Sequence, residues 1–430
     1  MTDREIARYA LRRCMDAGAG KAVCTLTFGE KKELNAEIGR MTLLRTTFDT
    51  ALGLLTLSGD RKGTTAVNKL DPGSIDAAAQ RAMALAAAAK ADPANEISEG
   101  QPPAEFSCGP EAPDLDLMHD RLREFLDDAG RLYPHTILEQ ATLEHRVGRQ
   151  YFLNSNGVEF LSRVGQFGFS LSFTTKADGK SSSMNFTGFT AADLGRPLRD
   201  HARVDALLAE STRQVVTRPV PEKFQGDLIV TPECLDDFLG FLMDNIGDYP
   251  LITGTSLYKD RLGDRVASQK LTVHARPLAA ELASRYFVTG DGYPARDATV
   301  VDHGILRMFL LSLYGARRTG KDRAANGGGC WIVEGGDTPY AEMVRSVERG
   351  VLVCRFSGGR PGPNGDFSGI AKNSWYIRDG RIDGPLSETM ISGNLASMLL
   401  DVKDVSRETV NFGSGISPWV RFGGVTVSGK

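Results

Sequence analysis

Short strand-like runs separated by glycine fill the second half of this 430-residue chain. Glycine readily adopts backbone conformations that end a strand or turn the chain sharply, so repeated glycine breaks favour many short strands. Few helical stretches interrupt the pattern. We therefore expect a twisted antiparallel sheet or a barrel with few helices in this half. The breaks lie at Gly290-Asp291-Gly292, Gly327-Gly328-Gly329, Gly335-Gly336, Gly358-Gly359 and Gly423-Gly424.

The first half mixes helical and strand-like stretches. An alanine-rich stretch that follows Asp71 predicts a capped helix, and alternation of apolar and polar residues predicts strands elsewhere. The fold class is therefore α+β, with a mixed domain of helices and antiparallel strands followed by a β-rich C-terminal domain. Predicted helices span 3–17, 72–90, 117–132 and 198–215, and predicted strands span 22–28, 41–57 and the block 137–189.

The length exceeds what a single hydrophobic core usually serves, so two domains are expected. The stretch Arg218-Pro219-Val220-Pro221 cannot continue a helix and is the best boundary. It separates an N-terminal domain, 1–217, from a C-terminal domain, 222–430. The connection 92–113 is rich in proline, glycine and glutamate, and it divides the first domain into two possible subdomains.

Composition narrows the class of function. The formal net charge of -3 argues against a nucleic-acid binder, which normally carries a basic surplus. No apolar run reaches the roughly 20 residues that span a bilayer, and the N-terminus has no secretory core. The six cysteines form no CxxC pair, which is typical of a reducing compartment and predicts a cytoplasmic protein.

A helix is predicted over 232–247, with Thr231 as its N-cap and Pro232 in its first turn. One face is apolar, and the paired acids Asp236 and Asp237 are expected on a solvated face. The helix contains no histidine. A second helix is predicted to begin at Thr338 and to end at Gly350.

The loop Asn326-Gly327-Gly328-Gly329-Cys330 is the most glycine-dense. No GK[ST] follows it, so a phosphate-binding loop is excluded and a tight turn beside a cleft is favoured. Cys330 is either a nucleophile, which would need a neighbouring histidine such as His303, or a small buried apolar residue. Asp366 and Ser368 follow a glycine turn and serve either as turn caps or in a cleft.

The six histidines never occur at metal-ligand spacing. They lie at His119, His135, His145, His201, His274 and His303. A hydrolytic zinc needs about three protein ligands, an open position for water and a nearby base. No metal site is therefore predicted in this chain.

Several stretches together resemble the TldD/PmbA family, in particular its PmbA (TldE) branch, long labelled "modulator of DNA gyrase". The resemblance spans nearly the whole chain in the order of the family. It is carried by Ala112-Pro113-Asp114-Leu115-Asp116-Leu117, Asn154-Ser155-Asn156-Gly157, Thr255-Ser256-Leu257, Asp302-His303-Gly304-Ile305-Leu306, Asn326-Gly327-Gly328, Gly365-Asp366-Phe367-Ser368 and Ile391-Ser392-Gly393-Asn394-Leu395.

The resemblance implies a heterodimeric zinc peptidase that cleaves peptides or unfolded segments in a protected cavity. In the family the TldD subunit carries a helical His-Glu-x-x-x-His motif and a C-terminal cysteine. The corresponding positions here are Gly240, Phe241 and Asn245, and the tail 411–418 has no cysteine. The resemblance thus implies a subunit without metal, with zinc in a TldD-like partner.

These observations predict a cavity-lining subunit without catalytic residues of its own, which pairs with a TldD-like partner or with itself through the C-terminal domain. The alternatives are a metal-independent hydrolase that uses Cys330 and a peptide-binding protein without catalysis. No membrane and no direct nucleic-acid partner is expected. The candidate substrate-binding residues are Asn326, Gly327, Gly328, Cys330, Asp366 and Ser368.

Overall fold

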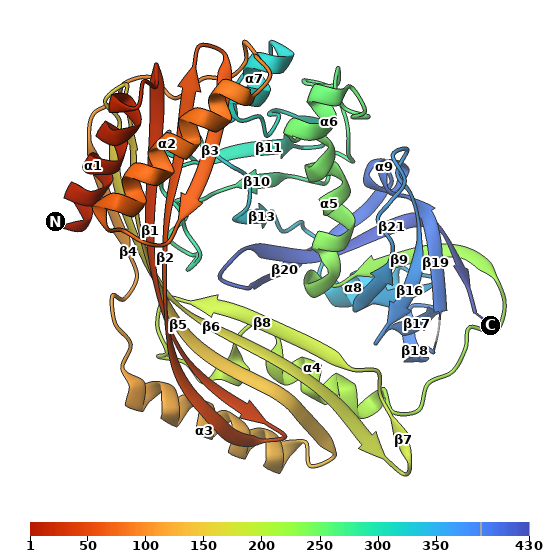
Figure 1. Ribbon diagram of the computed structural model, residues 1–430. Coiled ribbons are helices and arrows are strands. Elements are labelled where there is room, and N and C mark those ends of the chain that lie inside the picture. The colour runs from red at the N-terminus through yellow and green to blue at the C-terminus, as the bar shows by residue number, and fades with distance from the viewer. Residues whose placement is uncertain (388, 430) are drawn as a thin grey trace.

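The computed structural model describes residues 1–387 and 389–429, and it confirms the α+β class. In this part of the chain the strands form two separate sheets, one from each half of the sequence. Figure 1 shows the first sheet as a long curved surface, with the second half of the chain packed against its concave side.

The N-terminal sheet has the strand order β3-β2-β1-β5-β6-β4, with β7 and β8 also pairing with β6. Neighbouring strands are antiparallel except for β4 and β6, which are parallel. The described strands are β1 (Lys21–Glu37), β2 (Arg40–Ser58), β3 (Arg61–Val67), β4 (Ala104–Cys108), β5 (Thr136–Asn154), β6 (Glu159–Ala177), β7 (Lys180–Ser181) and β8 (Asn185–Ala191).

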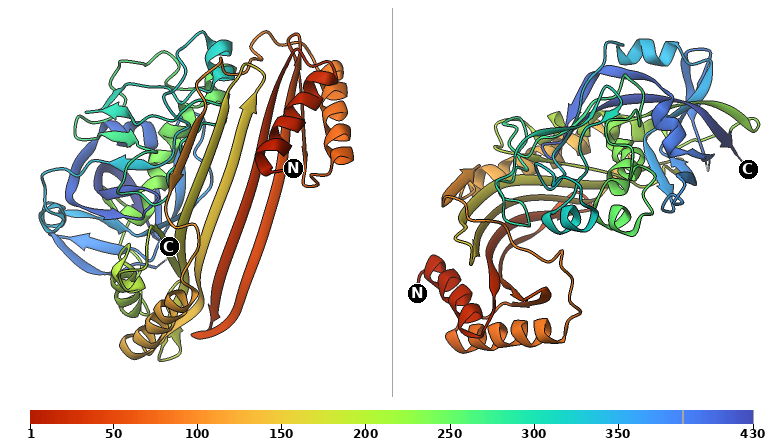
Figure 2. Two further views of the ribbon diagram at one scale, coloured as in Figure 1. Left: turned by 90° about the vertical axis from the view of Figure 1, so that its left-hand side faces the viewer. Right: turned by 90° about the horizontal axis from the view of Figure 1, so that it is seen from above.

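Two pairs of helices cover different parts of this sheet (Figure 2). α1 (Asp3–Asp16) and α2 (Pro72–Ala88) pack on its β1–β3 end, around buried Leu26, Leu52 and Ile75. Asp71 caps α2 as predicted, because its carboxylate accepts a hydrogen bond from Ser74 N at 3.0 Å. α3 (Leu115–Leu132) and α4 (Val204–Arg213) cover the other end.

Two predictions for this half need correction. The predicted helix 198–215 is split into a 3-10 turn, η1 (Leu198–Asp200), and α4, because Ala202 and Arg203 have φ angles of 44° and 57°. These left-handed residues cannot continue a right-handed helix. The connection 92–113 contains strand β4, which is held at the sheet edge by its pairing with β6.

The second sheet contains thirteen strands within the described residues, in the order β12-β11-β10-β13-β21-β9-β14-β17-β18, and it branches at β21 toward β20 and toward β19, β16 and β15. Most pairs are antiparallel. The strands are β9 (Phe224–Val230), β10 (Val273–Ala275), β11 (Ala298–Asp302), β12 (Ile305–Leu306), β13 (Trp331–Val333), β14 (Arg349–Val353), β15 (Arg355–Gly358), β16 (Asp366–Lys372), β17 (Trp375–Arg378), β18 (Arg381–Pro385), β19 (Thr389–Asn394), β20 (Val402–Asn411) and β21 (Ile416–Ser428).

Short helices join these strands. They are η2 (Pro232–Cys234), α5 (Leu235–Asn245), α6 (Asp248–Thr253), α7 (Leu313–Thr319), α8 (Tyr340–Arg345) and α9 (Leu395–Leu400). The predicted helix from Thr338 to Gly350 is wrong in its second half, because α8 ends at Arg345 and Gly350 lies in β14 opposite Asp227. A Cβ atom at Gly350 would lie 2.4 Å from Asp227 O, so this glycine permits a close strand approach rather than a helix end.

The two halves share a hydrophobic core. Leu171 and Leu207 of the first half belong to the same buried cluster as Ile229, Leu352 and Trp375 of the second. The chain segment that connects the halves is also fixed to the second half, because Arg218 N donates a hydrogen bond to Pro385 O at 3.0 Å. The division near 218–221 stays a prediction, and the shared core means that each half relies on the other for part of its packing.

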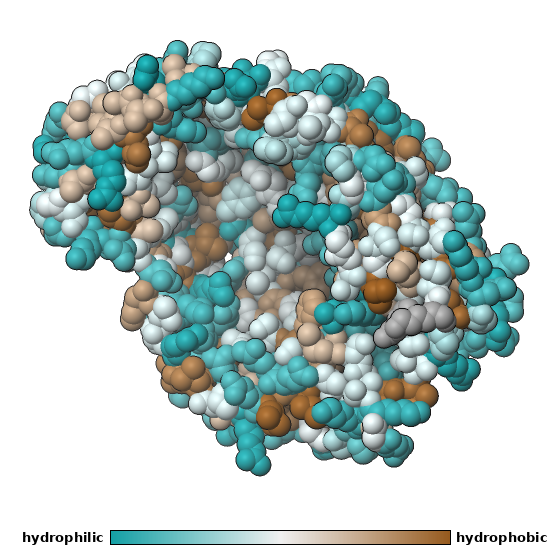
Figure 3. Space-filling view, turned by 45° about the vertical axis from the view of Figure 1, so that its right-hand side comes forward, coloured by the Kyte–Doolittle hydropathy of each residue, from teal (hydrophilic) through white to brown (hydrophobic). Residues whose placement is uncertain are grey.

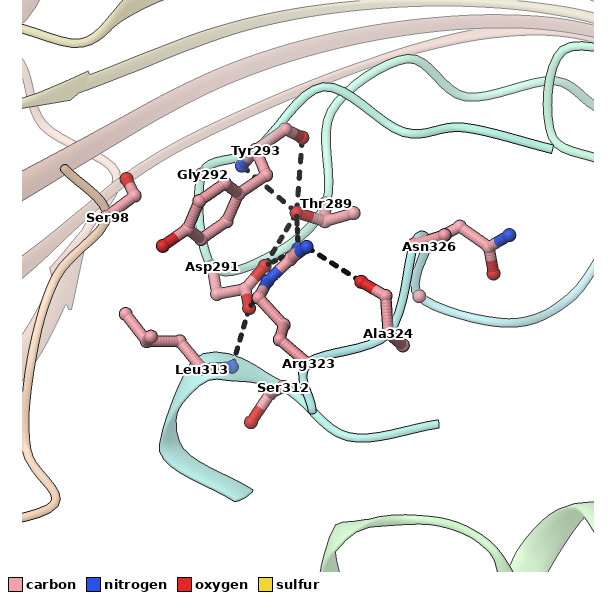
Figure 4. Close-up of polar contacts among 12 residues, drawn as sticks. Ser98, Thr289, Asp291, Gly292, Tyr293, Ser312, Leu313, Arg323, Ala324 and Asn326 are labelled. Carbon is pink, nitrogen blue, oxygen red and sulfur yellow. Dashed lines mark hydrogen bonds and ion pairs between the residues drawn. The ribbon is translucent and has the colours of Figure 1, made fainter. Parts of the chain in front are cut away.

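A polar joint links the halves at another place, and Figure 4 shows its residues from the second half. The Asp291 carboxylate accepts hydrogen bonds from Arg323 Nε at 2.8 Å and from Leu313 N at 2.7 Å. The Arg323 guanidinium lies over the Tyr293 ring, and Tyr293 donates from its hydroxyl to Glu99 of the first half at 2.5 Å. We refer to Thr289, Asp291, Tyr293, Arg323 and Glu99 as the polar joint.

Space remains between the two halves of the molecule near the N-terminal end of α5. Figure 3 shows that the molecule is hollowed in the middle of one face. In Figure 1, α5 stands beside this region, with β8 of the first sheet and β20 of the second sheet below it.

In the described part of the chain, no helix is long and apolar enough to cross a membrane.

Candidate functional site

α5 presents one apolar face and one acidic face. The apolar face is buried, and Phe238 packs with its ring centroid 5.6 Å from Phe356 and 5.9 Å from Phe367. The acidic face is open to solvent and carries Asp236, Asp237 and Asp244. The predicted solvated position of the paired aspartates is therefore confirmed.

The start of this helix differs from the prediction. Thr231 does not cap it with its side chain, and Thr231 Oγ1 is buried without a hydrogen-bond partner in the structure as described. The first turn is the 3-10 turn η2, and α5 begins at Leu235. Thr231 instead continues strand β9, because its backbone N donates to Val353 O at 3.0 Å.

The three positions that correspond to the metal motif lie in different surroundings. Gly240 faces open space, since a Cβ atom there would meet nothing within 4 Å. Phe241 is buried, with its ring centroid 6.5 Å from that of Tyr258, so a side chain at this position points into the core. Asn245 donates to Phe241 O at 2.9 Å, which caps the helix locally. The three side chains do not converge on one point.

A pocket of about 240 Å³ lies at the base of α5, between the two halves of the molecule. It combines aromatic rings, small hydroxyl side chains and two carboxylates. Its residues come from β8, from η2 and the start of α5, from β13, and from the loop before β21 and the start of β21. They are Phe186, Thr187, Gly188, Pro232, Glu233, Asp236, Trp331, Phe412, Ser414, Gly415 and Ser417.

The two carboxylates of this pocket differ in their pairing. Glu233 accepts hydrogen bonds from Arg203 at 2.9 Å and 3.1 Å, and Arg203 also binds Glu210 at 2.6 Å. Asp236 makes no hydrogen bond or ion pair with the residues that the structure describes. The surrounding protein and the charge of Asp237 raise the pKa of Asp236, although its side chain is open to solvent. An uncompensated carboxylate in a concave surface is a binding group for a donor or a cation.

The glycine loop lies beside this pocket and is tightly held. Asn326 is buried, and its amide nitrogen donates to Ala275 O at 3.1 Å and to Arg296 O at 2.8 Å. Figure 4 shows its amide pointing away from the polar joint. Gly327 N donates to the Tyr286 hydroxyl, which in turn donates to Gly328 O at 2.8 Å. The predicted tight turn is therefore present.

This loop reaches the pocket through Trp331. A Cβ atom at Gly328 would lie 3.5 Å from the Trp331 ring, which lines the pocket. Cys330 precedes Trp331 and adopts a φ angle of 49°. The loop thus sets the position of the tryptophan rather than offering polar side chains of its own.

Cys330 lacks the surroundings of a nucleophile. Burial raises its pKa to about 11, so the thiolate is scarce near neutral pH. Its thiol donates to Ser284 O at 2.9 Å, and the residue packs beside Ala279, Leu282 and Ile332. His303 lies in another pocket, where its Nδ1 is 2.8 Å from Asp302 Oδ1.

Asp366 and Ser368 lie on β16, away from the glycine loop in the sheet order. The Asp366 carboxylate accepts hydrogen bonds from the amides of Asn364 at 2.7 Å and Asn394 at 2.9 Å. Both hydrogen bonds lower the pKa of the Asp366 carboxyl group, and the bond from Asn394 has the larger effect. Ser368 is exposed opposite Ser392 of β19. This geometry supports the turn-capping role of Asp366.

The pocket residues Phe186, Trp331 and Phe412 belong to no sequence motif that predicts a site. They lie far apart along the chain, and only packing of β8 against the second half brings them together. Within residues 1–387 and 389–429, no group of three or more His, Cys, Asp or Glu side chains is arranged to hold a metal ion.

Residues 224–429 match the sequence profile of the PmbA/TldA metallopeptidase C-terminal domain. The metalloprotease PmbA of Escherichia coli is 24% identical over 98% of this chain and 97% of its own length. The PmbA homolog of Haemophilus influenzae is 26% identical over 94% of this chain and 91% of its own length. Residues 224–429 thus carry the C-terminal domain of the PmbA/TldA metallopeptidases, and the whole chain is similar to PmbA proteins.

Solved structures show the same fold over the full length. TldE of Thermococcus kodakarensis superposes with a TM-score of 0.86 at 17% identity, over 99% of this chain and 100% of that chain. A structure from Bacteroides thetaiotaomicron described as a putative modulator of DNA gyrase gives 0.87 at 19% identity, over 99% of both chains. A zinc metalloprotease TldD homolog from Saccharolobus solfataricus matches only 48% of this chain at 22% identity, over 50% of its own length. The resemblance found in the sequence is confirmed.

Proposed function

We propose that this PmbA/TldD-family chain is a subunit without metal that lines the cavity in which a TldD-like zinc metallopeptidase cleaves peptides or unfolded segments. The observation that carries the proposal is the solvent side of α5. In place of metal ligands it bears Asp236, Asp237 and Asp244 and open space at Gly240.

The requirements of zinc-dependent hydrolysis support assigning catalysis to the partner subunit. A hydrolytic zinc needs about three converging ligands and a base near its bound water. Gly240 offers no side chain, Phe241 points into the core and Asn245 is engaged with the backbone of its own helix. Zinc and the attacking water therefore belong to the partner subunit in this proposal.

The chain's own contribution is substrate binding in the pocket at the base of α5. The rings of Trp331, Phe186 and Phe412 offer apolar contact to a peptide side chain, and Asp236 offers an acceptor to its N–H groups. Strand β8 pairs with β6 on one side, and its residues Phe186 to Gly188 reach the pocket. An extended peptide can therefore align along this strand.

The six residues predicted for substrate binding contribute unequally in this proposal. Gly328 and Cys330 act through the position of Trp331, and Asn326 and Gly327 hold the loop. Asp366 caps a turn at the start of β16, and neither it nor Ser368 lines this pocket. The cytoplasm is the proposed location, supported by cysteines that are all unpaired.

The test is reconstitution with a TldD-like protein from the same genome. Zinc content and cleavage of an unfolded peptide are measured for each chain alone and for the mixture. We expect well below one zinc per chain in this protein, no cleavage by it alone, and cleavage when the partner is added. One zinc per isolated chain, or cleavage by the isolated chain, would overturn the proposal.

A Cys330-dependent hydrolase is the alternative of a different class. The raised pKa of Cys330 and the hydrogen bond from its thiol to Ser284 argue against this alternative. If the isolated chain hydrolyses peptides and Cys330→Ala abolishes that activity, this alternative holds instead. Binding of peptide without cleavage in any mixture would favour a peptide-binding protein.

A further inference from the structure

The pocket at the base of α5 carries more negative charge than its own cations balance. Glu233 and Glu210 share a single cation, because the Arg203 guanidinium donates to Glu233 at 2.9 Å and to Glu210 at 2.6 Å. Asp236, the other carboxylate of the pocket, forms no ion pair among the described residues. The surrounding protein and the charge of Asp237 raise its pKa, and no cation of the described residues lowers it. Asp236 is therefore an acceptor without a counter-charge inside a concave surface.

Aromatic rings line the same pocket. One of them already carries a cation, since the Arg355 guanidinium lies 4.8 Å from the centroid of the Phe186 ring. Trp331 and Phe412 also line the pocket, and no cation of the described residues lies over either ring. A guanidinium is attracted to an aromatic face and stacks on it. The contact between Arg355 and Phe186 shows this interaction beside the pocket, and Trp331 and Phe412 remain available for another.

A buried hydroxyl in the pocket wall lacks a hydrogen-bond partner. Thr187 of β8 lines the pocket and is 8% exposed, and its Oγ1 bonds to no group of the described residues. Most buried hydroxyls have a partner, because burial without one costs free energy. A ligand with N–H groups can supply the missing donor, whereas a purely apolar ligand would leave Thr187 unsatisfied.

We propose that this pocket binds the side chain of an arginine in an unfolded peptide. The guanidinium of that arginine donates to Asp236, and its planar face lies against Trp331 and Phe412. The pocket volume of about 240 Å³ is below the roughly 300 Å³ at which pockets for drug-sized ligands begin, so it suits a single side chain. The inference rests on the proposed role of this pocket in substrate binding and names the class of residue that the pocket selects.

Arginine fits the pocket better than the other charged side chains do. Its planar guanidinium can donate two N–H groups to one carboxylate while it stacks on a ring. The ammonium group of lysine is compact and more strongly hydrated, so it gains less from the rings. An acidic side chain would be repelled by Asp236.

The test is titration calorimetry of the isolated full-length chain, because every residue of the pocket belongs to this chain. The probes are glycine–serine peptides, capped at both ends, that differ only in one central residue: arginine, lysine, citrulline or glutamate. Citrulline keeps the shape of arginine without its charge. We expect the arginine peptide to bind at least about tenfold more tightly than the citrulline peptide. The lysine peptide should lie between them, and the glutamate peptide should bind most weakly.

The decisive variant is Asp236→Asn. It should reduce the preference for arginine over citrulline to less than about twofold and leave the affinity for the citrulline peptide unchanged. Asp244→Asn is the matched control, since it removes the same charge from the same helix, about 12 Å farther along, without lining the pocket. This control should keep the preference for arginine, and far-ultraviolet circular dichroism confirms that both variants are folded.

Four outcomes would overturn the inference. They are no binding of any peptide, equal affinity for arginine and citrulline, a preference that Asp236→Asn retains, and a preference that both variants lose equally. None of these measurements needs zinc or cleavage, so they are separate from the test of the proposed function. A mixture with a TldD-like partner that cleaves peptides without regard to arginine leaves that function standing. Arginine-selective binding without cleavage in any mixture would support this inference alone.

Discussion

Two of the places where the halves of this molecule meet use their carboxylates in opposite ways. At the polar joint, both oxygens of Asp291 accept hydrogen bonds, from Arg323, Thr289 and Leu313. At the base of α5, Asp236 faces the pocket and has no partner among the described residues. The Asp291 carboxylate therefore stabilises the fold, whereas the Asp236 carboxylate remains available to bind a ligand.

The pKa values follow the same difference. Burial by itself would raise the pKa of Asp291, but hydrogen bonds from Arg323 and Thr289 outweigh burial and lower it. At Asp236, whose side chain is exposed, partial desolvation by the surrounding protein and the charge of Asp237 act together and raise the pKa. Ionisation of Asp291 therefore stabilises the fold, and ionisation of Asp236 opposes it.

The largest expected effect is at the polar joint. Arg323→Ala removes the cation that Asp291 needs, and the side chains of both residues are less than a fifth exposed. We expect the free energy of unfolding to fall by about 3 kcal/mol. Chemical denaturation measures it, with Arg12→Ala, an exposed arginine of α1, as the control. A change under about 0.5 kcal/mol would mean that the Asp291–Arg323 pair does not stabilise the fold.

The pH dependence of the same variant sharpens the comparison. Since the pKa of Asp291 is lowered in the fold, its contribution is present above the unfolded value of about 4 and is lost as the pH falls through the folded value. The difference in unfolding free energy between wild type and Arg323→Ala should therefore shrink between pH 7 and about pH 3. A difference that stays constant with pH would show that lost packing, not lost charge pairing, causes the effect.

The smallest expected effect is at Asp236 and has the opposite sign. Since its pKa is raised in the fold, its ionised form costs stability above that pKa, and the cost disappears as the pH falls below about 4. Asp236→Asn should therefore stabilise the chain at pH 7 by up to about 0.5 kcal/mol and have no effect near pH 3. Asp60→Asn, in an exposed turn, is the control. Destabilisation at pH 7 would reveal a partner for Asp236.

Local signals predicted much of the fold. The capped helix after Asp71, the strands at 22–28 and 41–57 and the absence of histidine on α5 all follow from neighbouring residues, although β1 continues beyond the predicted end to Glu37. Two of the errors have a common cause. The sequence pattern predicts a helix end at Gly350, but strand β9 holds it in β14, and β4 is not predicted because β6 supplies its pairing. Pairing partners distant in sequence overrode local preference in both cases.

The sequence alone determined what α5 lacks, because a ligand that is not encoded cannot coordinate a metal in any fold. It also determined the family, since the motifs lie in order along the chain. Only the tertiary structure decided that Gly240 faces open space while Phe241 faces the core, and that aromatic rings from three distant segments form one pocket. It also decided that, among the described residues, half of β2 pairs with β1 alone. Each of these depends on which surfaces pack together, and burial and strand pairing over long separations have no local signature in the chain.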